Sequence, residues 1–576
     1  MGRTNRAWRR WLTSLPGVRA VIGYERRWLG ADVGAGLVLT ALLVPQGMAY
    51  AELAGLPAVT GLYTTVLALA AYAVFGPTRI LMLGPDSALA PLIAAAVVPL
   101  AAGDPAQAVS LAGVLALLTG AVCVGTSLAR LGTITELLSK PVRVGYINGI
   151  AVVVLVSQLP KLLGFSSDAD GFVAEVAAVV SGVGTGQVDA TAAVLGVGSL
   201  AIMLTTRRLS PRIPGVLAAT VVATLAVSAF DLAADGISVV GALPAGLPTP
   251  ALPRVGVGDL VSLGVAAVGV AVVAFADTAA LSTTFAAKLG DPVDPNKEIA
   301  ALGAANLAAG LFQGFPMSAS SSRTAVADAV GSKTQLTGVV GAVSIVGLLV
   351  FANDLLADLP SATLAAIVIV ASFALFDIDE MRWLWDVRRS EFLLSLGALL
   401  GVTLVGVLEG LGIAIGLSLG NFVRRAWRPH DAVLGRIEGL RGYHDIERHP
   451  EADQIPGLVI FRFDAPMFFA NAEHFQRRLA GAIRAAEDVR WVVLAAEPVT
   501  DIDTTAAETL REILDEFEAR NIQLAFAELK GPVKDRLRTY GLYDRIGDEH
   551  FYPTLGRATS GYLSATGVPW VDWTDR

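Results

Sequence analysis

The sequence predicts a polytopic α-helical membrane protein of about fourteen transmembrane segments, followed by a small cytoplasmic α/β domain. Apolar residues make up 54% of the 576 residues and charged residues only 16%, whereas a soluble domain carries roughly 25% charged residues. Uncharged apolar runs recur along the chain, and each approaches the roughly 20 residues that a helix needs to cross a bilayer. From residue 430 onward charged residues return, and all five histidines lie there.

The membrane domain is expected over 32–429, with repeat 1 over 32–233 and repeat 2 over 260–425. An additional helix at the membrane interface is expected over 168–182. The fourteen expected transmembrane segments are 32–54, 60–76, 86–101, 107–130, 142–161, 188–206, 213–233, 260–286, 296–313, 317–330, 335–356, 360–376, 390–405 and 407–425.

Basic residues predict the orientation in the membrane. Residues 1–31 contain seven arginines and lack a signal-peptide cleavage pattern, so this N-terminal segment is expected in the cytoplasm. With fourteen crossings, later basic clusters such as Arg207-Arg208 and Arg424-Arg425 also fall on the cytoplasmic side. We therefore expect a multi-pass protein of the inner (plasma) membrane with both termini in the cytoplasm.

The last part of the chain, 430–576, is expected to form a cytoplasmic α/β domain and a C-terminal tail. Strand-like runs alternate there with amphipathic helix patterns, as in a sheet covered by helices. The expected strands are 458–463, 491–495 and 522–529, and the expected helices are 472–486 and 504–520.

Two membrane segments begin with a Gly/Pro break and are too short to span the bilayer. Segment 86–101 follows Gly84-Pro85, and segment 317–330 follows Gly314-Phe315-Pro316. Each is third in its half of seven, an arrangement typical of an inverted-repeat transporter. A broken helix exposes N–H groups worth about half a positive charge, so two such ends facing one another would make an anion site. The alternative is an ordinary kinked helix, because proline is tolerated in membrane helices.

The tenth segment also carries serine hydroxyls and Arg323. A charged residue inside the membrane costs several kcal/mol unless it is paired or hydrated. Arg323 is therefore expected either to balance an anionic substrate or to pair with a protein carboxylate.

Three ordered motifs make the chain resemble a bacterial member of the SulP sulfate-permease family of anion transporters. They are Val44–Ala51 (VPQGMAYA), Gly84-Pro85, and Gly314-Phe315-Pro316 continuing to Thr324. The soluble domain resembles the STAS domain of that family. The resemblance implies a seven-plus-seven inverted repeat, in which a core domain (segments 1–4 and 8–11) moves against a gate domain (segments 5–7 and 12–14). It also implies a homodimer.

The resemblance assigns the substrate site to segments 1, 3 and 10. The residues that it implies are Gln46, Tyr50, Pro85, Ser87, Ser320, Ser321, Ser322 and Arg323. In the soluble domain, the related anti-sigma-factor antagonists are phosphorylated at the residue that matches Thr504, which makes Thr504 a regulatory candidate. The simpler interpretation of this place is that Asp503 is a helix N-cap.

Coupling to an ion gradient needs a group in the membrane that changes charge. Asp277 is the main candidate, because burial disfavours the charged carboxylate and lets it take a proton. A sodium ion held with Thr278 is the rival, and permanent pairing of Asp277 with Arg323 is the structural alternative. Asp86 either caps its helix or shares a proton with Asp277, and Glu52 is either a gate residue or an interfacial one.

These observations predict secondary active uptake of small anions, with sulfate and protons as the first choice and alternating access as the mechanism. Bicarbonate or C4-dicarboxylate transport, sodium coupling, exchange and a channel stay open. The membrane part lacks histidine and has a single cysteine, Cys123, so we expect no enzyme, cofactor or metal site. The formal net charge of −8 argues against a nucleic-acid partner.

Overall fold

The structure is a computed structural model that describes residues 16–17, 23–131, 139–167, 169, 171–209, 214–244, 246–251, 253, 255–290 and 293–573. The chain divides into two compact units, Met1–Ser418 and Leu419–Arg576. Of the predicted N-terminal segment 1–31, residues 1–15 and 18–22 lie outside the described part.

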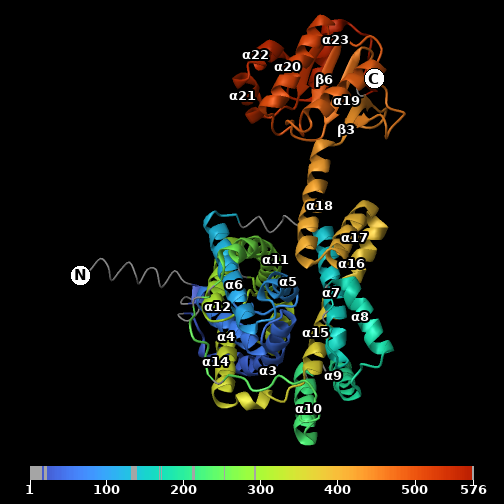
Figure 1. Cartoon of the computed structure of the whole chain (residues 1–576). Coiled ribbons are helices and arrows are strands. Elements are labelled where there is room, and N and C mark those ends of the chain that lie inside the picture. The colour runs from blue at the N-terminus through green and yellow to red at the C-terminus, as the bar shows by residue number, and fades with distance from the viewer. Residues whose placement is uncertain are drawn as a thin grey trace, which may run out of the picture. The chain divides into compact units, whose positions relative to one another are not determined.

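In the described part of the chain, each of the fourteen expected segments contains one α-helix, and segment 335–356 also contains a 3-10 helix, Asn353–Leu356 (Figure 1). Eight described helices are long and apolar enough to cross a membrane, and several shorter apolar helices accompany them. The helices are α3 (Leu29–Leu53), α4 (Ala58–Phe75), α5 (Ala90–Ala101), α6 (Pro105–Leu128), α7 (Lys140–Leu162), α9 (Ala190–Leu209), α10 (Gly215–Phe230), α11 (Val257–Leu289), α12 (Pro295–Leu311), α13 (Ser321–Val330), α14 (Leu336–Phe351), α15 (Ser361–Leu375), α17 (Arg389–Leu404) and α18 (Val407–Trp427).

Two further helices accompany these segments. The expected interfacial helix is α8 (Phe172–Gly184), and α16 (Ile378–Val387) was not predicted. The side chain of Asp377 caps α16 by accepting from the Glu380 N–H at 3.1 Å. Charged residues interrupt this stretch, so it offers no apolar run, and its two tryptophans, Trp383 and Trp385, are exposed, as is typical of a helix at a membrane surface.

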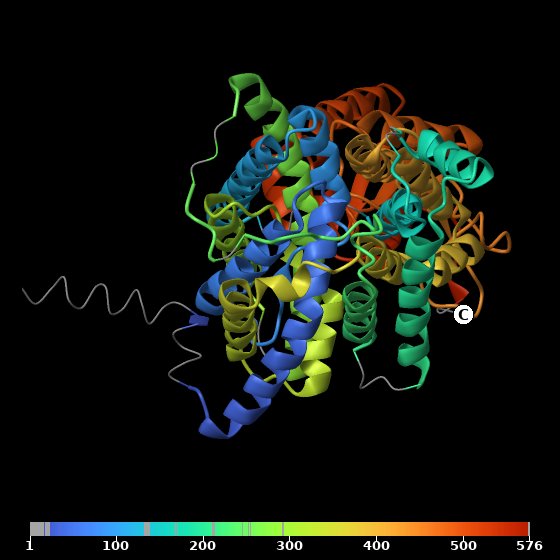
Figure 2. The same cartoon turned by 60° about the horizontal axis from the view of Figure 1, so that its bottom comes forward.

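Within the membrane unit the helices form two groups. In the core group, α12 packs against α6 and α4, while α3 packs against α4 and α14. In the gate group, α7 packs against α15 and α17, and α9 packs against α10 and α15. Figures 1 and 2 show the blue helices of the core group and the teal helices of the gate group on opposite sides of this unit. This grouping is the one that the family resemblance implied.

A buried carboxylate joins the start of α3 to the start of α14. Asp32 is fully buried and accepts from the backbone N–H groups of Lys333 and Thr334 at 2.7 and 3.1 Å. It also accepts from the hydroxyls of Thr334 and Thr337 at 2.7 and 3.1 Å. A carboxylate on one helix thus caps the N-terminus of another, which fixes the two repeats of the core to each other.

The second unit holds a six-stranded sheet of order β4-β3-β5-β6-β7-β8. Strands β5 to β8 are parallel, and β3 runs antiparallel to both β4 and β5. The strands are β3 (Asp431–Arg436), β4 (Tyr443–Asp445), β5 (Leu458–Phe463), β6 (Trp491–Ala495), β7 (Gln523–Ala527) and β8 (Phe551–Tyr552), and the helices are α19 (Ala472–Ala485), α20 (Thr504–Ala519), α21 (Gly531–Thr539), α22 (Tyr543–Ile546) and α23 (Leu555–Thr566).

The predicted strands and helices of this domain are confirmed to within a few residues. Alternation along β5 explains the layers: Val459 and Phe461 pack with α19 and α20, whereas Leu458 and Ile460 pack in the cluster that contains Tyr562 of α23. Both faces of the sheet are therefore covered by helices.

Candidate functional site

The two broken segments meet through a short antiparallel sheet. Strand β1 (Leu83–Gly84) pairs with β2 (Ser318–Ala319), with Leu83 opposite Ala319 and Gly84 opposite Ser318. The Ser320 N–H extends the ladder by donating to the Met82 carbonyl at 3.0 Å. Helices α5 and α13 both begin within a few residues of this contact, so it brings the starts of the two broken helices together.

A cavity of about 610 Å³ lies beside these helix starts. Eight of the residues predicted for substrate or coupling ion line it: Gln46, Tyr50, Asp86, Ser87, Asp277, Ser320, Ser321 and Ser322. Pro85, Arg323, Thr278 and Glu52 do not line it.

The two walls of this cavity, which we call the anion cavity, differ in chemistry. The core group supplies the polar wall, from α3, α11 and the starts of the two broken helices. The gate group supplies a mostly apolar wall, which includes Val144, Ile147, Val216, Ile367 and Val370. Hydroxyls and free amide N–H groups are donors that suit a small anion, so the binding capacity is concentrated on the core side.

Arg323 lies behind the polar wall and is fully buried. Its Nη2 donates to the Pro85 carbonyl, while its Nε and Nη1 have no hydrogen-bond partner among the described residues. A Cβ atom on Gly84 would collide with the guanidinium, so only glycine allows this close approach. The positive charge is thus fixed directly behind the start of the third segment, and Asp86 and Tyr50 are close enough to interact with it electrostatically.

The two carboxylates of the cavity have different surroundings. Asp86 accepts from the Ala88 N–H at 3.0 Å, which closes a turn before α5; the N-cap position of α5 is Leu89, so Asp86 is not the capping residue that was expected. Asp277 of α11 has no hydrogen bond or ion pair among the described residues, and no ion pair joins it to Arg323 there. Its neighbour Thr278 is buried, and its Oγ1 accepts from the Ala319 N–H of β2 at 3.3 Å.

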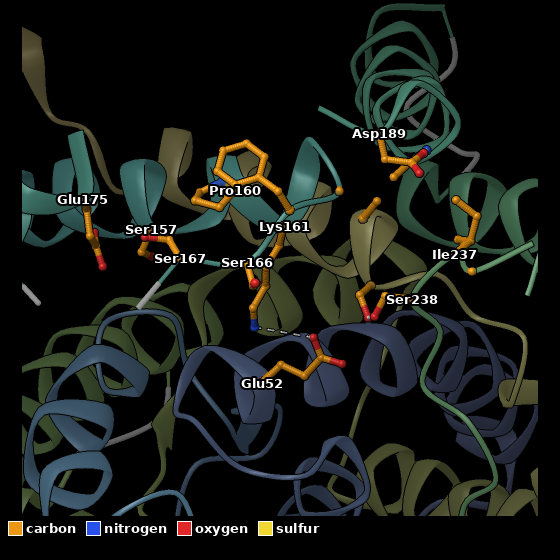
Figure 3. Close-up of a pocket in the computed structure, with 16 residues that line it drawn as sticks. Glu52, Ser157, Pro160, Lys161, Ser166, Ser167, Glu175, Asp189, Ile237 and Ser238 are labelled. Carbon is orange, nitrogen blue, oxygen red and sulfur yellow. Dashed lines mark hydrogen bonds and ion pairs between the residues drawn. The ribbon is translucent and has the colours of Figure 1, made fainter. Parts of the chain in front are cut away.

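Glu52 lies in a different cavity, of about 580 Å³. Figure 3 shows Glu52 of α3 and Lys161 of α7 pointing toward one another across it, and their carboxylate oxygen and Nζ are 3.9 Å apart. This ion pair joins the core group to the gate group and is separate from Asp277 and Asp86.

A buried network supports β1 from the side away from the cavity. Glu298 of α12 accepts from the Tyr72 hydroxyl at 2.7 Å and from the Thr78 hydroxyl. The Gln335 amide donates to the Thr78 and Leu81 carbonyls, both at 2.9 Å. This network was not predicted from the sequence, although a charged residue, Glu298, within a predicted transmembrane segment was the available signal.

Arg143 is a second residue that the sequence analysis missed. It lies one turn into α7 on the gate side of the anion cavity. The signal was a charge inside the predicted segment 142–161, which marks a functional candidate by default.

Thr504 is exposed at the first position of α20. Asp503 caps this helix by accepting from the Ala506 N–H at 2.8 Å, and it also accepts from the Phe469 N–H at 2.8 Å. The capping role is therefore present, and the Thr504 side chain is accessible to another protein.

The helical membrane unit, the cavity between two broken helices and the α/β domain define a membrane transporter of anions rather than an enzyme. Residues 29–398 match the sulfate permease family and residues 449–558 match the STAS domain. The chain belongs to the sulfate permease family.

The relatives in this family are similar over most of the chain. Two probable sulfate transporters of Mycobacterium tuberculosis are 43% identical over 548 residues, which is 95% of this chain and 98% of theirs. The chloroplastic sulfate transporter 4.1 of Arabidopsis thaliana is 32% identical, covering 90% of this chain and 78% of its own.

Solved structures show the same fold. Murine solute carrier 26 family member A9, an anion transporter in the inward-facing state, has a TM-score of 0.90 at 20% identity and covers 97% of this chain and 95% of its own. The transmembrane domain of a cyanobacterial bicarbonate transporter has a TM-score of 0.61 at 24% identity and covers 68% of this chain and 99% of its own.

Proposed function

We propose that this protein carries sulfate into the cell together with protons, by secondary active transport across the inner membrane. The observation that carries the proposal is the Asp277 carboxylate, which has no hydrogen bond or ion pair among the described residues and lies on the same cavity wall as the starts of two broken helices. The names of the mycobacterial and plant relatives support sulfate as the anion.

The charges at the site support proton coupling. Two helix ends contribute about +1 together, and Arg323 adds one positive charge, whereas Asp86 and Asp277 each carry a negative charge when ionised. The local positive potential is then about balanced by the two carboxylates, so the two negative charges of bound sulfate stay uncompensated. A proton from outside offsets one of these charges, and Asp277 is the better acceptor because no hydrogen bond or ion pair within the described chain holds its carboxylate.

The two walls support alternating access by movement of the core group against the gate group. The polar wall keeps the anion while the core group moves along a gate wall that is apolar over α10 and α15, with basic side chains only on α7 and α9. The anion cavity extends to Lys140 and Arg207, which lie at helix ends that the positive-inside rule assigns to the cytoplasm. We therefore assign this conformation to the inward-open state, with both termini of the chain in the cytoplasm.

We further propose a homodimer, and regulation of transport by the STAS domain. The exposed Thr504 hydroxyl at the start of α20 is the candidate modification site. Cross-linking of the full-length protein in membranes tests the dimer, and transport by Thr504→Glu tests the regulation.

A panel of radiolabelled anions tests the substrate in proteoliposomes that contain the full-length protein. Sulfate uptake that rises with an inward proton gradient is the expected result. Preferential uptake of bicarbonate or a C4-dicarboxylate would identify that anion, rather than sulfate, as the substrate. Sodium-driven uptake would identify sodium, rather than the proton, as the coupling ion. Uptake that responds to no ion gradient but needs an anion on the far side would indicate an exchanger. Uptake that needs only an electrical driving force would indicate a channel.

A further inference from the structure

Arg143 is a partly buried cation on the gate wall of the anion cavity. Within the described part of the chain its side chain makes no hydrogen bond or ion pair. The neighbouring cations differ: Lys140 pairs with Glu380 at 2.7 Å, and Arg207 is exposed at the end of α9. Arg143 is therefore a cavity-lining charge whose side chain has no hydrogen-bond or ion-pair partner among the described residues.

Asp277 lies on the opposite wall and is close enough to Arg143 for an electrostatic interaction. The other ionisable groups that act on it are Asp86, at the start of the third segment, and Tyr146 of α7. Helix α6, which packs against α11, carries no charged side chain between Pro105 and Leu128.

One further charge lines the cavity on the gate side: the exposed Asp377, which lies between α15 and α16. The other charges near these helices lie outside the cavity. Those of α12, Lys297 and Glu298, lie in its first turns, where Glu298 is held by Tyr72 and Thr78. Strand β2 contributes no charge. Arg323 lies behind the polar wall, next to Asp86 and Tyr50.

The charged groups around Asp277 lie partly on the core group and partly on the gate group. Asp86 and Arg323 belong to the core group with Asp277, so their effect on Asp277 stays the same when the core moves. Arg143 belongs to the gate group, so its distance from Asp277 changes during alternating access. A nearby positive charge favours the ionised carboxylate. Arg143 is thus a charge of the gate group whose influence on Asp277 depends on the conformation.

We propose that Arg143 releases the coupling proton on the cytoplasmic side. In the inward-open state Arg143 faces protonated Asp277 across the cavity and stabilises its carboxylate form, so the proton passes from the Asp277 carboxyl to cavity water. In the outward-open state the core has moved away from Arg143, and Asp277 accepts a proton from outside. This inference rests on the proposed proton-coupled transport. Arg143 is a positioning residue that acts through the charge state of Asp277. It is not an anion ligand.

The test measures net sulfate uptake in proteoliposomes while the pH on the cytoplasmic side is varied at constant external pH. Removal of the positive charge in Arg143→Gln makes proton release harder, so the cytoplasmic pH profile should move upward by about one unit. Arg143→Lys should restore the wild-type profile. Arg208→Gln is the matched control, since it removes one exposed cytoplasmic charge outside the cavity. Sulfate–sulfate exchange at equal pH on both sides should persist in Arg143→Gln, because it requires no proton release.

Two results would overturn the proposal. One is an unchanged pH profile in well-folded Arg143→Gln beside a proton-coupled wild type. The other is a loss of exchange together with net uptake, which would make Arg143 an anion ligand. In the Asp277→Asn background, Arg143→Gln should have no further effect on the pH profile, and an additional shift would show that it acts elsewhere. Wild-type uptake that is indifferent to pH would instead remove the proposed proton coupling itself.

Discussion

Asp277→Asn tests proton coupling most directly, because asparagine keeps the size of the side chain but cannot ionise. Sulfate carries two negative charges, and a proton on Asp277 lowers by one the net negative charge that crosses the membrane with it. Moving one net negative charge into a cell at 100 mV, negative inside, costs about 2.3 kcal/mol. At about 1.36 kcal/mol per tenfold, one proton thus offsets a roughly 50-fold penalty in accumulation.

The proton also carries the chemical gradient, which supplies about 1.36 kcal/mol for each pH unit. In Asp277→Asn the side chain at position 277 is neutral throughout the transport cycle, so it releases no proton inside the cell. We expect wild-type uptake to rise as external pH falls. We expect the accumulation ratio of Asp277→Asn to lose about a factor of ten for each pH unit of gradient, while sulfate–sulfate exchange continues.

The assay is sulfate accumulation in proteoliposomes under imposed pH gradients, with and without sodium. Asp259→Asn is the matched control, because it makes the same charge change in the first turn of the same helix, α11. An unchanged pH dependence in Asp277→Asn would remove Asp277 from coupling. Sodium-dependent uptake that is indifferent to pH would replace the proton by a cation.

Four further predictions concern the framework of the site. Arg323→Ala should reduce sulfate affinity and transport sharply in a folded protein, and anion affinity that survives would refute its charge-balancing role. Gly84→Ala should abolish transport, because the added Cβ collides with the Arg323 guanidinium. Gly347→Ala, at a glycine with open space around it, should leave transport unchanged, and uptake assays on both variants test this difference. Asp32→Ala leaves buried donors without an acceptor and should destabilise the membrane unit by about 2–4 kcal/mol, measured as a lower melting temperature in detergent; an unchanged melting temperature would show that water replaces the carboxylate. Truncation after residue 430 should lower transport but retain sulfate binding, and a stable truncated protein without binding would place part of the site in the STAS domain.

Much of the fold could be predicted, because long apolar runs and alternating strands leave strong periodic signals. Segment 458–463 matches β5 in both bounds, since a nearly continuous apolar run lies between Pro456-Gly457 and Asp464, which mark its ends. Helix α16 could not be found in the same way, because its amphipathic sequence contains no apolar run.

The site was harder to predict than the fold. The glycine and proline breaks indicated which two segments meet, but β1 and β2 are only two residues long each, too short for any pattern in the sequence. The direction of a side chain depends on the register of its helix, so sequence could not tell that Arg323 lies behind the cavity wall while Ser322 lines it. Arg143 and Asp277 come close only through the packing of the two groups, which has no local signature.

The short ladder between β1 and β2 has a mechanical consequence. Main-chain hydrogen bonds across it join the first repeat to the second at the anion site itself, and breaking them in a water-poor interior would leave costly unpaired N–H and C=O groups. The two helix ends therefore cannot separate to let the anion in or out. The anion must meet the same donors whether it arrives from outside or from the cytoplasm, and what differs between the two sides of the membrane is the surface of the gate group that lies opposite.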